Sequence, residues 1–218
     1  MPFLMLDLDN TLIDRDAAFR SAAAEFLTQH GLPSDELAWL LATDASGYAP
    51  RADVASAMSG RYRDHAPAGA VHALLDTGDA DHVTLAQSTA SALHEARAAG
   101  WTCVIVTNGR TAQQEAKIRN TGLDRLVHGW VVSEAIGHKK PAPEILQAAA
   151  TLAGLPLTDA WLVGDSPHAD IAGAHALGLR SVWVSRPDAP WPYGSYGPTH
   201  RAADAASAIA HVIGANRS

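Results

Sequence analysis

Residues 3–12 read FLMLDLDNTL, and this stretch decides how the rest of the chain is interpreted. It begins as an unbroken apolar run and becomes acidic at Asp7 and Asp9. A continuous apolar run, without alternation, is typical of a strand that is covered on both faces, as in a parallel sheet. We therefore predict a strand over residues 3–8 with two carboxylates where it ends.

Similar apolar runs recur along the chain, at residues 101–107, 130–132, 160–164 and 181–184. Alanine-rich segments with helical spacing cover residues 85–99, 143–153, 168–177 and 202–213, and a glycine follows each of them, as expected at a helix end. This alternation predicts an α/β fold: a parallel sheet with helices on both faces and right-handed crossovers.

Residues 15–82 depart from the alternation, because they contain no strand-like run. Their spacing predicts helices over 16–30, 34–42, 51–63 and 68–76, punctuated by Pro and Gly. We therefore expect an α/β core domain formed by residues 1–14 and 83–218, with a helical insert at 15–82.

Composition excludes several classes of protein. With 218 residues, 47% apolar content and a net charge of −7, the chain is neither disordered nor built around a basic stripe for a nucleic-acid polymer. The lone cysteine, Cys103, reads as a buried hydrophobe on a strand. The N-terminus lacks the basic start of a signal peptide, and no apolar stretch is long enough for a membrane helix, so we expect a cytoplasmic protein without a membrane partner.

Polar side chains gather at the ends of the predicted strands. Asp7 and Asp9 follow the first strand, and Thr107 and Asn108 end the second. Lys139 and Lys140 come after the third, and Asp165 and Asp170 after the fourth. Ligands of open parallel sheets bind beyond the carboxyl ends of the strands, so these groups are expected to converge.

This set of residue types suits a phosphoryl group and a magnesium ion. Asp7 and Asp9 are two residues apart and would share a face of an extended strand. Crowded carboxylates are stabilised by a divalent cation, and Mg²⁺ takes carboxylates, waters and a substrate phosphate. A lysine would offset the remaining charge, while Thr107 and the N–H groups of Asn108 and Gly109 would donate to phosphate oxygens.

Four motifs at these positions resemble those of the haloacid dehalogenase-like (HAD) superfamily: DLDNTL at 7–12, VTNG at 106–109, GHKKP at 137–141 and VGDSPHADIAGA at 163–174. They occur in the family's order, and the resemblance spans essentially the whole chain. It implies a Rossmann-like core with an inserted α-helical cap, of the subclass whose cap follows the first strand.

The resemblance also implies roles for individual residues. Asp7 matches the nucleophile, which forms an aspartyl-phosphate, and Asp9 matches the general acid and base. Thr11 matches a residue that braces their loop. Thr107 and Asn108 match the groups that bind phosphate oxygens.

Three further residues take roles around the metal and the charge. Lys140 matches the lysine that balances the nucleophile and the phosphate. Asp165 matches a Mg²⁺ ligand, alongside the Asp7 carboxylate and the Asp9 main-chain carbonyl. Asp170 matches the acidic residue that holds the lysine or a metal-bound water.

Two positions differ from the commonest family pattern. Residue 10 is Asn where Gly is frequent, and a left-handed backbone would accommodate both residues. The lysine is doubled, and the register favours Lys140, with Lys139 as a solvated neighbour.

Other polar residues have simpler readings. Asp14 and Asp16 are expected at a helix start, and Ser166 suits either the metal site or a helix N-cap. Tyr48 and Arg51 fit a specificity loop or an exposed helix start equally well. Residues 187–198, rich in Trp and Tyr, are expected to form a surface loop.

The leading functional hypothesis is a Mg²⁺-dependent phosphomonoester hydrolase, a phosphatase of small soluble phosphorylated metabolites. Three alternatives remain. A 2-haloacid dehalogenase shares the fold but lacks the second aspartate, a phosphosugar mutase retains it, and a non-catalytic regulatory protein would have lost a motif residue. A monomer and a homodimer are both compatible with the sequence.

Overall fold

The computed structural model describes residues 1–215, which form two compact units. One unit comprises residues 1–13 and, of the described residues that follow the insert, 85–215, and the other is Asp14–Thr84. An isolated antiparallel bridge pairs Ile13 with Leu85, the two residues at which the first unit is interrupted. The chain therefore leaves and re-enters this unit at a single point.

The first unit is built on a six-stranded sheet in which every pair of neighbouring strands is parallel. The spatial order is β3-β2-β1-β4-β5-β6. The strands are β1 (Phe3–Leu6), β2 (Thr102–Thr107), β3 (Gly129–Val132), β4 (Trp161–Gly164), β5 (Arg180–Val184) and β6 (His200–Ala202). The predicted α/β fold with a parallel sheet is confirmed.

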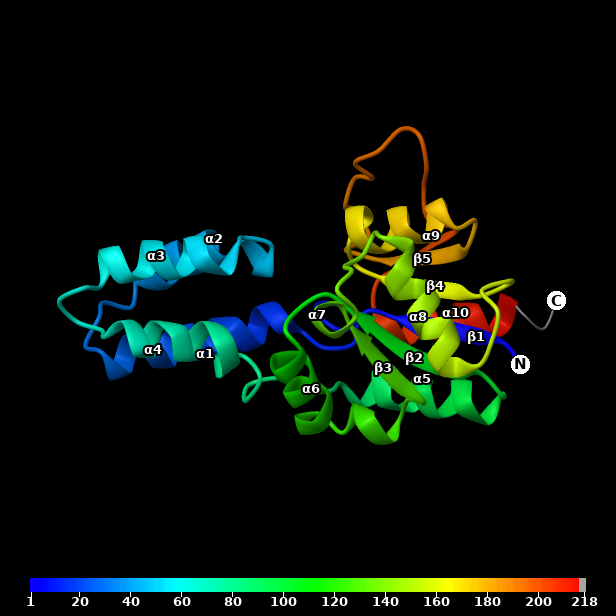
Figure 1. Cartoon of the computed structure of the whole chain (residues 1–218), viewed down its shortest axis with the longest axis horizontal. Helices are drawn as coiled ribbons and strands as arrows, with labels where there is room; N and C mark the ends of the chain where they lie inside the picture. The colour runs from blue at the N-terminus through cyan, green and yellow to red at the C-terminus, as the bar shows by residue number, and fades with distance from the viewer. Residues whose placement is uncertain (216–218) are drawn as a thin grey trace. The chain divides into compact units, whose positions relative to one another are not determined.

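Helices cover both faces of this sheet (Figure 1). Phe3 and Met5 point to the face that packs against Ile145 and Leu146 of α8 (Pro143–Ala153) and against α9 (Ala172–Ala176). Side chains of a strand alternate between faces, so Leu4 and Leu6 point the other way. The remaining helices of this unit are α5 (Gln87–Ala98), α6 (Thr111–Asn120), α7 (Ser133–Ile136) and α10 (Ala205–Ala215).

Burial on both faces explains why the strands read as continuous apolar runs. Every residue of β1, β2 and β4 is buried. Cys103 lies within β2, and burial raises the pKa of its thiol to about 12. The prediction of a buried cysteine on a strand is confirmed.

The strand order reverses beside β1. From β1 the chain proceeds outward to β2 and β3, then crosses to β4 on the other side and continues to β5 and β6. Such a reversal leaves a crevice at the carboxyl ends of the two strands that flank it, which is where open α/β sheets bind ligands. Here Asp7 follows β1 and Asp165 follows the adjacent β4.

The second unit is helical throughout its regular structure. Its helices are α1 (Arg15–Gln29), α2 (Glu36–Asp44), α3 (Arg51–Arg61) and α4 (Ala68–Ala73), the last continuing into a π-helical turn (Leu74–Gly78). Phe19, Phe26, Leu40, Met58 and Tyr62 belong to its apolar core. Asp14 caps α1 by accepting from the Ala17 N–H at 2.9 Å, as predicted for a helix start.

Several predicted bounds were wrong. β1 ends at Leu6, and the expected helix at 202–213 begins only at Ala205, because His200–Ala202 forms the edge strand β6. The expected helix at 168–177 is a π-helical turn (Pro167–Ile171) followed by the short α9. Within residues 1–215 no helix combines the length and apolar character of a membrane span.

Candidate active site

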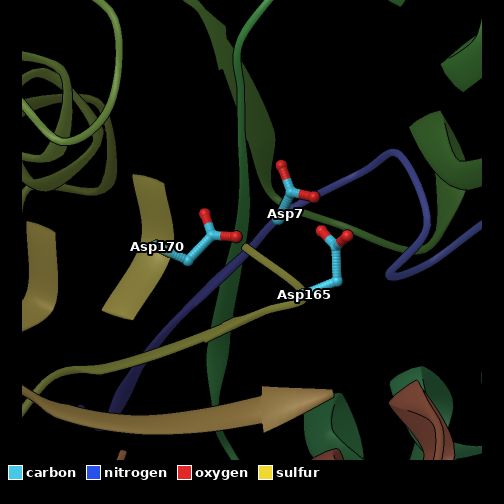
Figure 2. A group of neighbouring side chains, drawn as sticks. All are labelled: Asp7, Asp165 and Asp170. Atoms are coloured by element: carbon cyan, nitrogen blue, oxygen red, sulfur yellow. The ribbon is translucent and has the colours of Figure 1, made fainter. Parts of the chain in front are cut away.

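Three carboxylates from separate segments meet at the carboxyl end of the sheet (Figure 2). Asp7 follows β1, Asp165 follows β4, and Asp170 lies in the π-helical turn after β4. Each offers one oxygen, and the three oxygens lie within 4.8 Å of one another. Asp7 and Asp170 are buried, and Asp165 is half-buried.

A buried lysine provides the counter-charge for two of these groups. The Lys140 ammonium is 2.5 Å from Asp7 Oδ1 and 2.7 Å from Asp170 Oδ1. Lys140 is only 3% exposed, whereas its neighbour Lys139 is exposed. Lys140 is therefore the lysine that the structure brings to the carboxylates, and Lys139 is the solvated one, as predicted.

The electrostatics show an excess of negative charge. Burial raises the pKa of Asp7 to about 7, with Asp170 adding to the shift and Lys140 opposing it. Burial also raises the pKa of Asp165 to about 9, and the neighbouring Asp7 and Asp170 carboxylates contribute. Burial lowers the pKa of Lys140, but Asp170 and Asp7 more than offset this, so its pKa lies above the ordinary value.

A glycine and a helix N-cap near the end of β4 allow the Asp170 side chain to reach the site. A Cβ atom at Gly164 would lie 2.2 Å from the Asp170 carboxyl carbon, so glycine is required where β4 ends. Asp170 accepts from the Ser166 N–H at 3.0 Å, and the Ser166 hydroxyl accepts from the Ala169 N–H at 3.2 Å. Ser166 is thus the N-cap of this turn, one of the two readings left open by the sequence.

The loop after β1 is braced by Thr11. Its hydroxyl donates to Asp7 Oδ2 at 3.2 Å and approaches Asp165 Oδ1 at 3.4 Å. Asn10 has a φ of 57°, so the left-handed backbone predicted at this position is confirmed. Asn tolerates this conformation better than most residues with a side chain.

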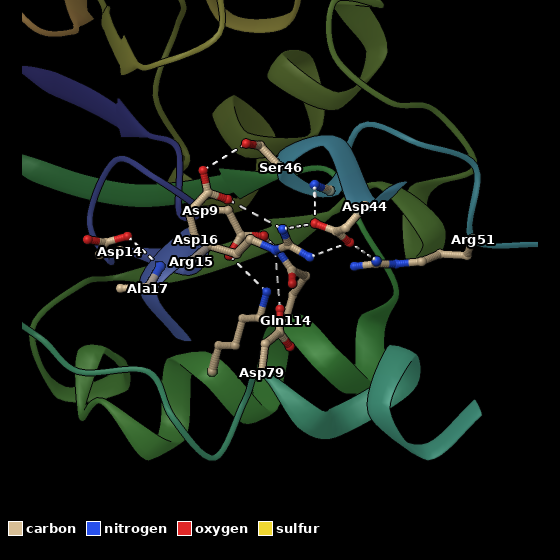
Figure 3. Close-up of polar contacts among 12 residues, drawn as sticks. Asp9, Asp14, Arg15, Asp16, Ala17, Asp44, Ser46, Arg51, Asp79 and Gln114 are labelled. Carbon is tan, nitrogen blue, oxygen red and sulfur yellow. Dashed lines mark hydrogen bonds and ion pairs between the residues drawn. The ribbon is translucent and has the colours of Figure 1, made fainter. Parts of the chain in front are cut away.

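The expectation that Asp7 and Asp9 share a strand face was wrong. β1 ends at Leu6, and the turn that follows rotates Asp9 away from the alternation of a strand. The Asp9 carboxylate is bound by two side chains of α6. Lys117 Nζ lies 2.9 Å from Oδ1. Gln114 Nε2 donates to Oδ2 at 2.9 Å (Figure 3). The third carboxylate of the cluster is that of Asp170.

Thr107 and Asn108 lie at the end of β2 and make defined contacts. Thr107 is buried, and its hydroxyl accepts from Gln114 Nε2 at 2.6 Å. The Asn108 side chain bonds the Lys140 main chain twice, donating to the carbonyl at 3.0 Å and accepting from the N–H at 2.8 Å. The Gly109 N–H donates to Ser133 Oγ at 3.0 Å. Asn108 therefore ties the β2 loop to the segment that carries Lys140.

Three residues at this site were missed at the sequence level. Gln114 and Lys117 lie on α6, a helix that the apolar pattern does not reveal because its buried face carries polar residues. Lys117 is one of the three lysines of the chain, and this rarity was the available signal. Trp183, at the end of β5, donates its indole N–H to the Asp165 carbonyl at 2.7 Å.

The predicted aromatic loop, residues 187–198, packs against Trp183. Trp191 packs edge-on against Trp183, with 5.0 Å between ring centroids, and against Tyr196 at 5.8 Å. The Tyr196 hydroxyl reaches the Pro167 carbonyl at 3.4 Å. No helix or strand is assigned within residues 187–198, so the loop prediction is confirmed. Through Trp183 and Tyr196, the aromatic rings contact the segment that carries Asp165.

The second unit contains its own buried charge network (Figure 3). The Arg15 guanidinium forms a two-pronged ion pair with Asp44 and approaches Asp79 at 3.4 Å. Arg51 donates to the same Asp44 at 2.6 Å, whereas Tyr48 is 65% exposed. Arg51 therefore has a structural partner, and a role in specificity stays a prediction for both residues.

The donor chemistry of the carboxylate cluster fits a hard divalent cation. Asp7, Asp165 and Asp170 offer only oxygen ligands, the type that Mg²⁺ and Ca²⁺ prefer. One ammonium, that of Lys140, contacts two of the three carboxylates, Asp7 and Asp170. Burial, and after it the neighbouring carboxylates, raise the pKa values of Asp7 and Asp165. A cation bound between Asp7 and Asp165 would add positive charge to this cluster.

Comparison with known proteins gives consistent matches. The family model described as haloacid dehalogenase-like hydrolase matches residues 4–184. The glyceraldehyde 3-phosphate phosphatase of Pyrococcus abyssi is 28% identical over 190 residues, 83% of this chain and 79% of that protein. The phosphoserine phosphatase of Thermus thermophilus is 35% identical over 94 residues, 43% of this chain and 38% of that protein.

A solved structure has the same fold. The HAD-hydrolase YfnB of Bacillus subtilis superimposes with a TM-score of 0.79 over 97% of this chain and 98% of that one, at 22% identity.

Proposed function

Because the chain belongs to the haloacid dehalogenase-like hydrolase family, we propose that it is a Mg²⁺-dependent hydrolase of small soluble phosphate monoesters that forms an aspartyl-phosphate on Asp7. The observation that carries the proposal is the buried Asp7 carboxylate, ion-paired with Lys140 and set against Asp165 and Asp170. A strongly charged, partly desolvated site of this kind is suited to a phosphoryl group, whose transfer depends on positioning and charge neutralisation.

In the first step, a carboxylate oxygen of Asp7 attacks phosphorus in line with the departing oxygen. The new bond joins Asp7 Oδ to phosphorus, and the bond between phosphorus and the leaving oxygen breaks. That oxygen keeps the electron pair and takes a proton from Asp9, so the product leaves as an alcohol. Lys140 and Thr11, which both contact Asp7, hold the nucleophile in place.

In the second step, water attacks the phosphorus of the aspartyl-phosphate. Asp9, now ionised, takes a proton from the water, the bond between Asp7 and phosphorus breaks, and inorganic phosphate leaves. Thr107 and the backbone N–H of Asn108 bind phosphate oxygens, since the Asn108 side chain is engaged with Lys140.

The carboxylates of Asp7 and Asp165, with the Asp9 main-chain carbonyl, would hold Mg²⁺. When bound, the ion neutralises phosphate charge and orients the phosphate oxygens. Asp170 holds Lys140 in place: its Oδ1 atom lies 2.7 Å from Lys140 Nζ.

The helical unit at residues 14–84 is inserted into the core where the family resemblance implies a cap, and we propose that role for it. Its two connections to the core are adjacent at the bridge between Ile13 and Leu85, and Ile13 is only four residues after Asp9. In enzymes that have a cap, its closure excludes water during the reaction.

A substrate screen tests the proposal directly. Purified protein with Mg²⁺ is expected to release phosphate from p-nitrophenyl phosphate and from several small esters, including glyceraldehyde 3-phosphate and phosphoserine, and EDTA is expected to abolish this release. Absence of activity across a broad panel would refute the hydrolase. Halide release from 2-chloropropionate without phosphate release would favour a dehalogenase, and phosphate transfer between sugar positions a mutase.

Magnesium is also expected to change how stability depends on pH. Asp7 and Asp165 have folded-state pKa values of about 7 and about 9, above the ordinary aspartate value of about 3.9. The metal-free folded protein thus binds more protons than the unfolded chain, so its stability falls as pH rises from about 5 to 9. Mg²⁺ takes the place of these protons and should raise Tm by roughly 3 °C or more at pH 8 and much less at pH 5.

Thermal melts with and without Mg²⁺ at both pH values measure this effect. Asp165→Asn should weaken the dependence on both pH and Mg²⁺, whereas Asp188→Asn, at an exposed position in the 187–198 loop, should leave it unchanged. A Mg²⁺ effect equal at pH 5 and pH 8 would contradict the assignment of these carboxylates to the metal.

A further inference from the structure

Helix α6 presents an unusual buried face to the site. Gln114 and Lys117 are both 1% exposed, and with Gln113 and Ile118 they form the buried face of α6. They are three residues apart, a spacing that places two side chains side by side on one face of a helix. Both contact the same carboxylate, that of Asp9.

The two contacts occupy both oxygens of Asp9. Lys117 Nζ lies 2.9 Å from Oδ1. Gln114 Nε2 lies 2.9 Å from Oδ2 (Figure 3). A carboxylate bonded through both oxygens cannot rotate freely about its side-chain torsions. Asp9 itself follows β1 on a turn and its side chain is 26% exposed, and the two α6 side chains bind its carboxylate there.

Gln114 joins Asp9 to a second functional group. Its Nε2 atom also lies 2.6 Å from the Thr107 hydroxyl and 3.4 Å from the Asn108 carbonyl. One amide therefore spans the residue proposed to transfer the proton and the residue proposed to bind the phosphate.

Glycine at position 109 leaves space for this amide. A Cβ atom there would lie 2.9 Å from Gln114 Cγ and 3.0 Å from Cδ, closer than side chains pack. The backbone at Gly109 has a φ of 151°, at the edge of the region that favours glycine. The absence of a side chain at Gly109, in the VTNG segment, therefore allows Gln114 of α6 to pack against this segment.

A buried ion pair alone is weak evidence of function, because apolar residues of the same shape are often equally stable in its place. Here the lysine contacts a partly exposed carboxylate, that of Asp9, and a second side chain completes the contact. We propose that Gln114 and Lys117 are positioning residues that hold the Asp9 carboxyl at a fixed place relative to Thr107, so that it meets the leaving oxygen. This inference rests on the proposed function.

The dependence of the rate on the basicity of the leaving oxygen distinguishes a positioning role from a merely structural one. Loss of a structural contact would slow all substrates equally. Protonation matters most when the leaving oxygen is strongly basic and least when the leaving group is stable as an anion. A series of para-substituted phenyl phosphates, from methoxy to nitro, keeps the shape nearly constant while the basicity of the leaving oxygen falls. The ratio kcat/KM reports the steps up to departure of the leaving group, so it isolates the protonation by Asp9.

Lys117→Met and Gln114→Leu are the test variants. For each, kcat/KM for p-methoxyphenyl phosphate should fall roughly tenfold or more, while that for p-nitrophenyl phosphate falls less than about threefold. Near-normal hydrolysis of the nitro ester would also show that the variants are folded. Arg119→Met removes a positive charge from the same helix at a 58% exposed side chain and should leave the whole series unchanged.

Several outcomes would overturn the inference. An equal loss for all esters, or no loss, would mean that the two side chains only stabilise the fold. A crystal structure of Lys117→Met in which Asp9 keeps its side-chain rotamer would exclude the positioning role independently of activity. A wild-type protein that hydrolyses no ester would instead refute the proposed function, and the inference with it.

Discussion

Asp7→Asn is expected to reduce phosphate release by at least about 10⁴-fold, the largest effect of any single substitution in this chain. The amide has the shape of the carboxylate but cannot form the aspartyl-phosphate. The fold should be retained, because Lys140 keeps its ion pair with Asp170 and because a neutral group costs less to bury than the Asp7 carboxylate.

Two measurements check this result. Steady-state assays compare Asp7→Asn with Asp188→Asn, which removes an exposed carboxylate of the same size and should have the wild-type rate. Mass spectrometry of acid-quenched protein should find a phosphate adduct on Asp7 in the wild type and none in the variant. A variant that turns over at more than a small fraction of the wild-type rate would remove Asp7 as the nucleophile.

Lys140→Met is expected to have the second largest effect, and on two properties. Activity should fall roughly 10²–10³-fold, because the ammonium that balances Asp7 and the incoming phosphate is lost. Stability without metal at pH 8 should fall by about 3 kcal/mol, since removing one partner of a buried ion pair leaves the other uncompensated. Asp7 and Asp170 both lose their counter-charge at once.

The doubled lysine provides a matched control. Lys139→Met removes the same atoms one residue away, from an exposed side chain, and should change neither rate nor melting temperature measurably. Lowering the pH should reduce the stability difference between Lys140→Met and the wild type, because the orphaned carboxylates then take up protons. Equal effects of the two substitutions would contradict the assignment of Lys140.

Most of the sheet could be predicted from the sequence because its strands are covered on both faces. The residues of β1, β2 and β4 are all buried, so their apolar runs are unbroken and easy to recognise. The edge strand β6 escaped prediction for the opposite reason. His200, Arg201 and Ala202 are exposed or half-buried, and they pair with β5 through backbone groups that leave no pattern in the side chains.

Helix α6 was hidden for a related reason. A search for apolar spacing finds a helix whose buried face is apolar, and the buried face of α6 includes Gln113, Gln114 and Lys117. Such a face is stable only because partners exist elsewhere in the fold. Asp9, the partner of Lys117, is 108 residues away in the chain, and no local pattern connects them.

The order and type of the charged groups are local properties, and the sequence was sufficient for them. An acidic turn after a buried strand, a glycine before Asp165 and a lysine before a proline can be read along the chain, and together they indicated the family and the chemistry. Which groups meet is a property of strand order and of turn geometry. The pairing of β1 with β4 brings Asp7 to Asp165, and the turn after Leu6 sends the Asp9 carboxylate to α6, so the third carboxylate of the cluster is that of Asp170. Contacts between distant segments depend on how the whole sheet packs. Only the tertiary structure could therefore show which of these residues touch.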